Sequence, residues 1–137
     1  MFMNLAGLIS SAIRYIGRGD TLPVNTQLDN HSAITLYLEN EKCIHVMTID
    51  DTPVIWSVIC EYKRVDTQSI SESLLSVMNN YSPFFHFGQP ALVNIDDNIE
   101  LRATFSLLAL KNEETMAAAI NDYALVMENI FKIYNIN

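Results

Sequence analysis

Residues 28–38 read LDNHSAITLYL, and this stretch decides how the rest of the chain is interpreted. Its second half alternates apolar and polar side chains, with the apolar ones at Ile34, Leu36 and Leu38. This period of two is typical of a strand with one buried face. We therefore predict a half-buried strand that begins shortly after Ser32.

The first half of the stretch, LDNHS, allows two interpretations. His31 and Ser32 beside Asp29 contain the residue types of a hydrolytic triad, but the chain has no G-x-S-x-G elbow or comparable local signature. Asp, Asn and Ser side chains readily bond to nearby backbone groups in turns. We interpret these five residues as a turn that leads into the strand.

Four further segments have strand patterns. CIHVMTI (43–49) and VIWSVIC (54–60) are separated by DDTP, so together with the first strand they predict an antiparallel meander. ALVNI (91–95) and IELRATFSLLAL (99–110) flank Asp96-Asp97-Asn98, which predicts a hairpin turn.

Three segments have helical periodicity. The first has one apolar stripe, made of Leu5, Leu8, Ile9, Ala12, Ile13 and Ile16, and Gly17 and Gly19 end it. The second is predicted from about Ser69 to Asn80, because Ser69 and Glu72 have the spacing of a capping box. Asn112 is the predicted N-cap of the last helix, with Glu113 and Glu114 in its first turn.

The element order is therefore α-β-β-β-α-β-β-α. The chain has 137 residues, no internal repeat and no long linker. We predict a single α+β domain over residues 1–137, an antiparallel sheet packed with helices.

The charge balance argues against several partners. The chain has 16 acidic and 8 basic residues, and its basic residues are scattered, so we expect binding neither to nucleic acid nor to anionic membranes. Its apolar N-terminal stretch is interrupted by polar residues, and no run reaches transmembrane length. We expect a protein that stays in the cytoplasm.

Chemical motifs are scarce. The three histidines and two cysteines lack zinc-ligand spacing, and neither a P-loop nor G-x-G-x-x-G is present. We expect no metal, no cofactor and no enzymatic activity. An enzyme would have only Cys60 or His31 as its centre, and would need a concave polar pocket around it.

Apolar surface, in contrast, is abundant: half of the residues are hydrophobic. Three amphipathic helices and about five strands have more apolar faces than one small sheet easily covers. A second copy or a bound apolar peptide would cover the remainder. The alternative is that all the stripes meet in one monomer core.

A resemblance covers nearly the whole chain and rests on the element order and three segments. These are LAGLISSAI in the first helix, LDNHSAITL entering the first strand, and VIWSV with the single tryptophan. The chain resembles the class I type III secretion chaperones, most closely the multi-effector class IB branch of the Spa and invasion-type systems. The resemblance implies a bacterial cytoplasmic homodimer that binds N-terminal effector segments in an extended form and keeps them competent for export. Contact with the export ATPase is left open.

The resemblance also implies two sets of residues. The effector groove would contain Leu5, Leu8, Ile9, Ile34, Leu36, Ile44, Val46 and Trp56. The dimer interface would contain Ile70, Leu74, Val77, Met78, Leu92 and Val93. The alternative function is a non-enzymatic dimeric adaptor or regulatory binding domain.

Overall fold

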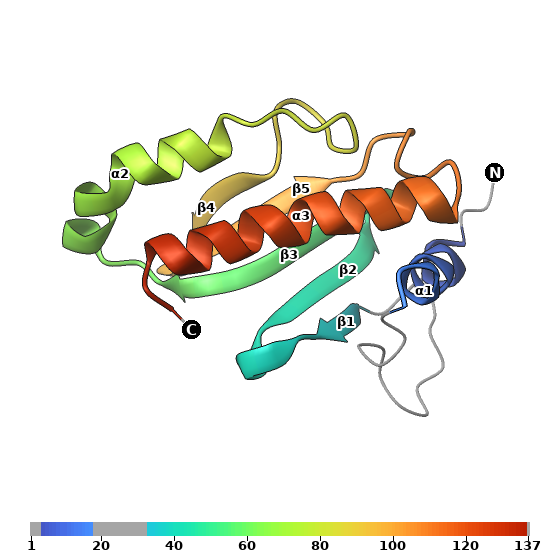
Figure 1. Ribbon diagram of the computed structural model, residues 1–137, viewed down its shortest axis with the longest axis horizontal. Helices are drawn as coiled ribbons and strands as arrows, with labels where there is room; N and C mark the ends of the chain where they lie inside the picture. Colours follow the sequence, from blue (N-terminus) through green and yellow to red (C-terminus); the bar gives the residue numbers. More distant parts are fainter. Residues whose placement is uncertain (1–3, 18–32, 137) are drawn as a thin grey trace.

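The computed structural model describes residues 4–17 and 33–136 (Figure 1). The elements in chain order are α1 (Leu5–Tyr15), β1 (Ile34–Tyr37), the short 3-10 turn η2 (Glu39–Glu41), β2 (Cys43–Ile49), β3 (Thr52–Glu61), α2 (Arg64–Met78), β4 (Ala91–Ile95), β5 (Asn98–Thr104) and α3 (Glu113–Ile133). The predicted α+β class and element order are confirmed. The predicted turn at 28–32, with His31 and Ser32, and the helix-ending Gly19 lie outside the described residues.

The five strands form one antiparallel sheet in the order β1-β2-β3-β5-β4. Helix α3 runs across one face of this sheet (Figure 1). Helix α1 packs against α3, where the Tyr15 hydroxyl donates to Glu114 at 3.0 Å. Helix α2 packs against the other end of α3, where the hydroxyls of Thr67 and Tyr134 lie 3.3 Å apart.

Two tight turns set the register of the meander and of the β4–β5 hairpin. Asp50-Asp51 and Asp96-Asp97 all have φ between 50° and 66°, so both turns have two residues in the left-handed region. Such turns match the twist of antiparallel strands, and Asp tolerates this conformation better than most residues. The prediction that both acidic pairs occupy turns is confirmed.

The register also decides which side chains face the helices. Val46, Ile55 and Ala103 lie side by side on β2, β3 and β5, and all three are buried. Above this layer lies Tyr123 of α3, whose hydroxyl is 2.8 Å from the Leu101 carbonyl oxygen. Side chains at alternate strand positions therefore make the core with α3.

Two predicted boundaries were wrong. Helix α2 begins at Arg64 rather than near Ser69, and the Ser69 hydroxyl donates to the Asp66 carbonyl at 2.8 Å inside the helix. A serine can bond to a carbonyl of the preceding turn, so the capping-box spacing there does not mark a helix start. The last strand ends at Thr104, and residues 107–110 form a turn.

Candidate binding surface

A row of side chains crosses the sheet on the face away from the core. The register aligns Thr35, His45, Trp56, Arg102 and Ala91 on five strands, and all five residues are half-buried. We call these five residues the outer row. The Thr35 hydroxyl lies 3.0 Å from Nδ1 of His45, whose ring centroid is 5.4 Å from that of Trp56.

The outer row has little net charge. The Arg102 guanidinium lies 5.6 Å from the Trp56 ring centroid and donates to Glu100 at 2.9 Å. Partial burial lowers the pKa of His45, and the nearby Glu100 carboxylate opposes this in part. His45 is therefore neutral at pH 7. The one cation of the outer row, Arg102, is paired with Glu100.

The free edge of β1 lies at one end of this row. The Leu38 N–H donates to the Lys42 carbonyl at 2.8 Å, so the residues at even positions of β1 are those that bond to β2. The N–H and C=O groups of Thr35 and Tyr37 therefore point away from β2. Within the described ranges no strand pairs with this edge, and the Tyr37 side chain is 57% exposed.

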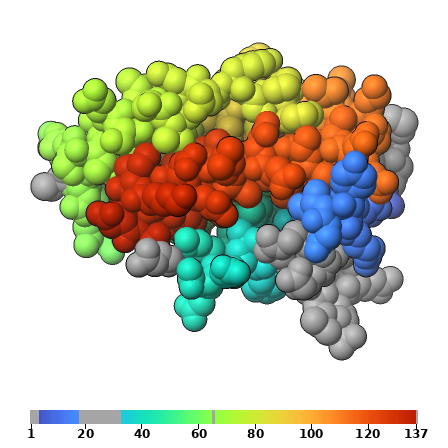
Figure 2. Space-filling view, viewed as in Figure 1, coloured from blue at the N-terminus to red at the C-terminus, as the bar shows by residue number. Residues whose placement is uncertain are grey.

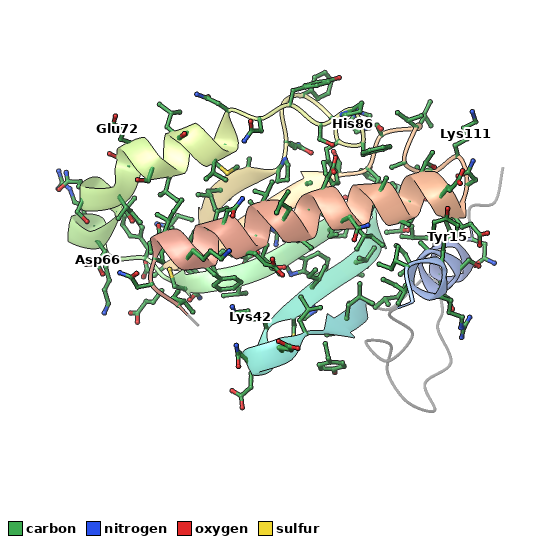
Figure 3. All side chains as sticks on the ribbon, in the orientation of Figure 1. Tyr15, Lys42, Asp66, Glu72, His86 and Lys111 are labelled. Atoms are coloured by element: carbon green, nitrogen blue, oxygen red, sulfur yellow. The ribbon has the colours of Figure 1, made fainter. Side chains whose placement is uncertain are left out.

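A cavity of about 410 Å³ opens where β1 ends. Its floor includes Leu38, Met127 and Phe131, and the Lys42 ammonium lies 4.5 Å from the Phe131 ring centroid. Figure 3 shows Lys42 between the turn after β1 and helix α3. Lys42, Lys132, Glu39 and Glu128 line the cavity as well, so it combines an apolar floor with charges of both signs.

Residues 20–96, more than half of the chain, match the invasion protein B family. The chain belongs to the invasion protein B family. The match includes β1 to β4 and α2, and supports the resemblance to type III secretion chaperones at the family level. No curated protein matches the chain.

In this invasion protein B family member, the residues predicted to form the effector groove lie mostly in the core. Six of the eight side chains are buried: Leu5, Ile9, Ile34, Leu36, Ile44 and Val46. Leu8 and Trp56 are half-buried and have surface for a partner. The effector-binding role of the set stays a prediction.

The residues predicted for the dimer interface fall into three groups. Leu74 is 7% exposed and belongs to the core of one copy, whereas Val93 is exposed. The other four are half-buried and pack against that core: Ile70, Val77, Met78 and Leu92. Leu75, which the predicted interface does not include, is 62% exposed, and the apolar periodicity of α2 is too weak to separate it from buried Leu74.

Residues 4–17 and 33–136 contain no group of three or more His, Cys, Asp or Glu side chains that could hold a metal ion. Cys43 and Cys60 are free thiols, and burial, followed by the Asp66 charge, raises the pKa of Cys60. No helix in the described part of the chain is long and apolar enough to cross a membrane.

Proposed function

We propose that the protein is a class IB type III secretion chaperone in the bacterial cytoplasm. It binds the N-terminal segments of one or more effectors in an extended form and keeps them competent for export. It acts as a homodimer without catalysing a reaction. The match of residues 20–96 to the invasion protein B family carries this proposal.

The free edge of β1 supports an extended ligand. A peptide strand can bond to the outward backbone groups of Thr35 and Tyr37, because bonds to the backbone do not require a particular ligand sequence. Alternate side chains of such a strand would extend the outer row next to Thr35, on the same face of the sheet as His45. Affinity would then come largely from backbone hydrogen bonds, which tolerate several effector sequences.

The cavity at the end of β1 supports the same arrangement. Leu38 follows β1 directly and also lines the cavity, so a strand paired with β1 would reach it within one or two residues. An apolar side chain of the effector would fit the floor formed by Met127 and Phe131. Edge and cavity together would bind one continuous segment.

The experiment is calorimetric titration of this protein with the N-terminal segment of an effector encoded beside its gene. Tyr37→Pro removes an outward N–H of the β1 edge and the exposed ring, but no hydrogen bond between β1 and β2. We expect effector binding to weaken about ten-fold because one hydrogen bond to the effector is lost. The matched control is Asn94→Pro, which removes an outward N–H at the opposite edge of the sheet. This control should bind like the wild type.

Two results would contradict the proposal at different levels. A folded wild-type chain that binds no segment of this kind would exclude the effector function and favour the adaptor alternative. Equal affinities for Tyr37→Pro and the wild type would exclude the β1 edge as the binding site.

A further inference from the structure

Phe87 has an unusual backbone conformation for its residue type. It has φ +47° and the following Gly88 has φ +73°, and the Gln89 N–H donates to the His86 carbonyl at 2.9 Å. A two-residue turn with both φ values positive favours Asn-Gly, whereas a bulky side chain at its first position is disfavoured. The Phe87 side chain is 98% exposed, so its burial within this copy does not offset that cost.

The turn that carries Phe87 is held firmly against the end of β5. The His86 N–H donates to the Thr104 carbonyl at 3.1 Å. The Gln89 side-chain oxygen accepts from the Thr104 N–H at 2.6 Å and from its hydroxyl at 2.8 Å. The backbone that carries the Phe87 side chain is therefore held in place, which lowers the backbone entropy lost on binding a partner.

A cavity of about 190 Å³ lies close to this turn, between the end of α2, the segment after it and α3. Its apolar lining is Val77, Tyr81, Phe85, Pro90, Leu125 and Val126. The Ser82 hydroxyl donates to Asp122 at 2.9 Å, so these two polar groups in the lining are paired. An apolar cavity of about 150 Å³ holds benzene in another protein, so this one has room for a phenyl ring.

The charge distribution indicates what covers this surface. Between Glu72 and Asp96 the sequence has no Asp, Glu, Lys or Arg, although the whole chain has a net charge of −8. Two copies of so acidic a chain repel each other, and the repulsion is weakest where the surface with fewest charges meets itself. Asp122 of α3 is the one charged residue of the cavity lining, and it accepts a hydrogen bond from Ser82. In Figure 2 this segment forms the yellow-green to yellow surface beside α3.

We propose that Phe87 of each copy inserts into this cavity of a second copy across a two-fold axis. Phe85 and Pro90 line the cavity and flank the Phe87 turn in the chain, so anchor and cavity are close together. A two-fold interface requires both insertions at once, and this closeness lets one compact contact contain them. The inference rests on the proposed homodimer and names residues that hold it together.

The test is the self-association constant measured by analytical ultracentrifugation at micromolar concentration. Phe87→Asn suits the left-handed turn, so the chain should stay folded by circular dichroism while self-association weakens about 30-fold or more. Val126→Trp, which fills the cavity from α3, should weaken it as well. The matched control is Leu107→Asn, because Leu107 is 83% exposed and lies outside both anchor and cavity.

Three results would overturn the inference: a monomeric wild type, unchanged association of Phe87→Asn, or equal weakening by Leu107→Asn. The effector titration is repeated on the same variants. A chain that binds effector but does not pair through Phe87 contradicts this inference alone, whereas a paired chain that binds no effector contradicts the proposed function alone.

Discussion

The buried Tyr123 hydroxyl bonds to the two polar groups that it meets in the core. Its hydroxyl lies 2.8 Å from the Leu101 carbonyl oxygen and 2.9 Å from the Ser57 hydroxyl, and burial raises its pKa, so it stays a neutral phenol. We expect Tyr123→Phe to lower the free energy of unfolding by about 1–2 kcal/mol, because it leaves buried Ser57 without this partner. Urea unfolding measures this free energy, and the control is Tyr81→Phe at an exposed tyrosine. A loss no larger than the control's would contradict this role.

Single residues could be predicted from the sequence where their chemistry is local. Asn112 caps α3 as predicted. Its side chain accepts from the Thr115 N–H at 2.9 Å, and its own N–H donates to the Thr115 hydroxyl. Both bonds depend only on neighbours in the chain. Ser69 has an equally good local pattern but lies inside α2. The conformation of Phe87 left no sequence signal, because it is set by bonds between its turn and β5.

Helix α2 offers a test at the scale of the element, because it has adjacent leucines with opposite environments. Leu74→Asp would bury a carboxylate beside the core of one copy, so we expect a loss of about 3 kcal/mol or more in the free energy of unfolding. The control is Leu75→Asp on the exposed side, which should change it by about 0.5 kcal/mol or less.

Chemical denaturation of both variants, at a concentration where each is monomeric, separates packing within one copy from pairing between copies. Full stability of the monomeric Leu74→Asp variant would show that α2 does not depend on the burial of Leu74.

Strands were predicted well where alternation and turn residues coincide. Asp50-Asp51 and Asp96-Asp97 bound β2, β3, β4 and β5 closely. The end of β5 was missed because apolar residues continue past Thr104 without a glycine or proline, although Leu107 is exposed. The pattern of side chains alone cannot separate a buried strand from an exposed apolar turn.

For the molecule as a whole, the sequence predicted the α+β fold, whereas the effector groove and the dimer interface stay predictions. The effector groove was assigned to the most apolar positions of β1 and β2, and in a sheet covered by α3 those side chains point toward the helix. The outer row uses the alternate positions, such as Thr35 and His45, which are less apolar. The period-two pattern of these strands predicts the residues of the opposite face, because every second side chain lies on it.

The proposed function requires that an extended effector segment pairs with the free edge of β1. Hydrogen–deuterium exchange of the chain, alone and saturated with that segment, measures this directly at single amides. We predict that the amides of Thr35 and Tyr37 become protected on binding, while Asn94 at the opposite edge keeps its exchange rate. Unchanged exchange at Thr35 and Tyr37 in a saturated complex would show that the effector does not pair with β1.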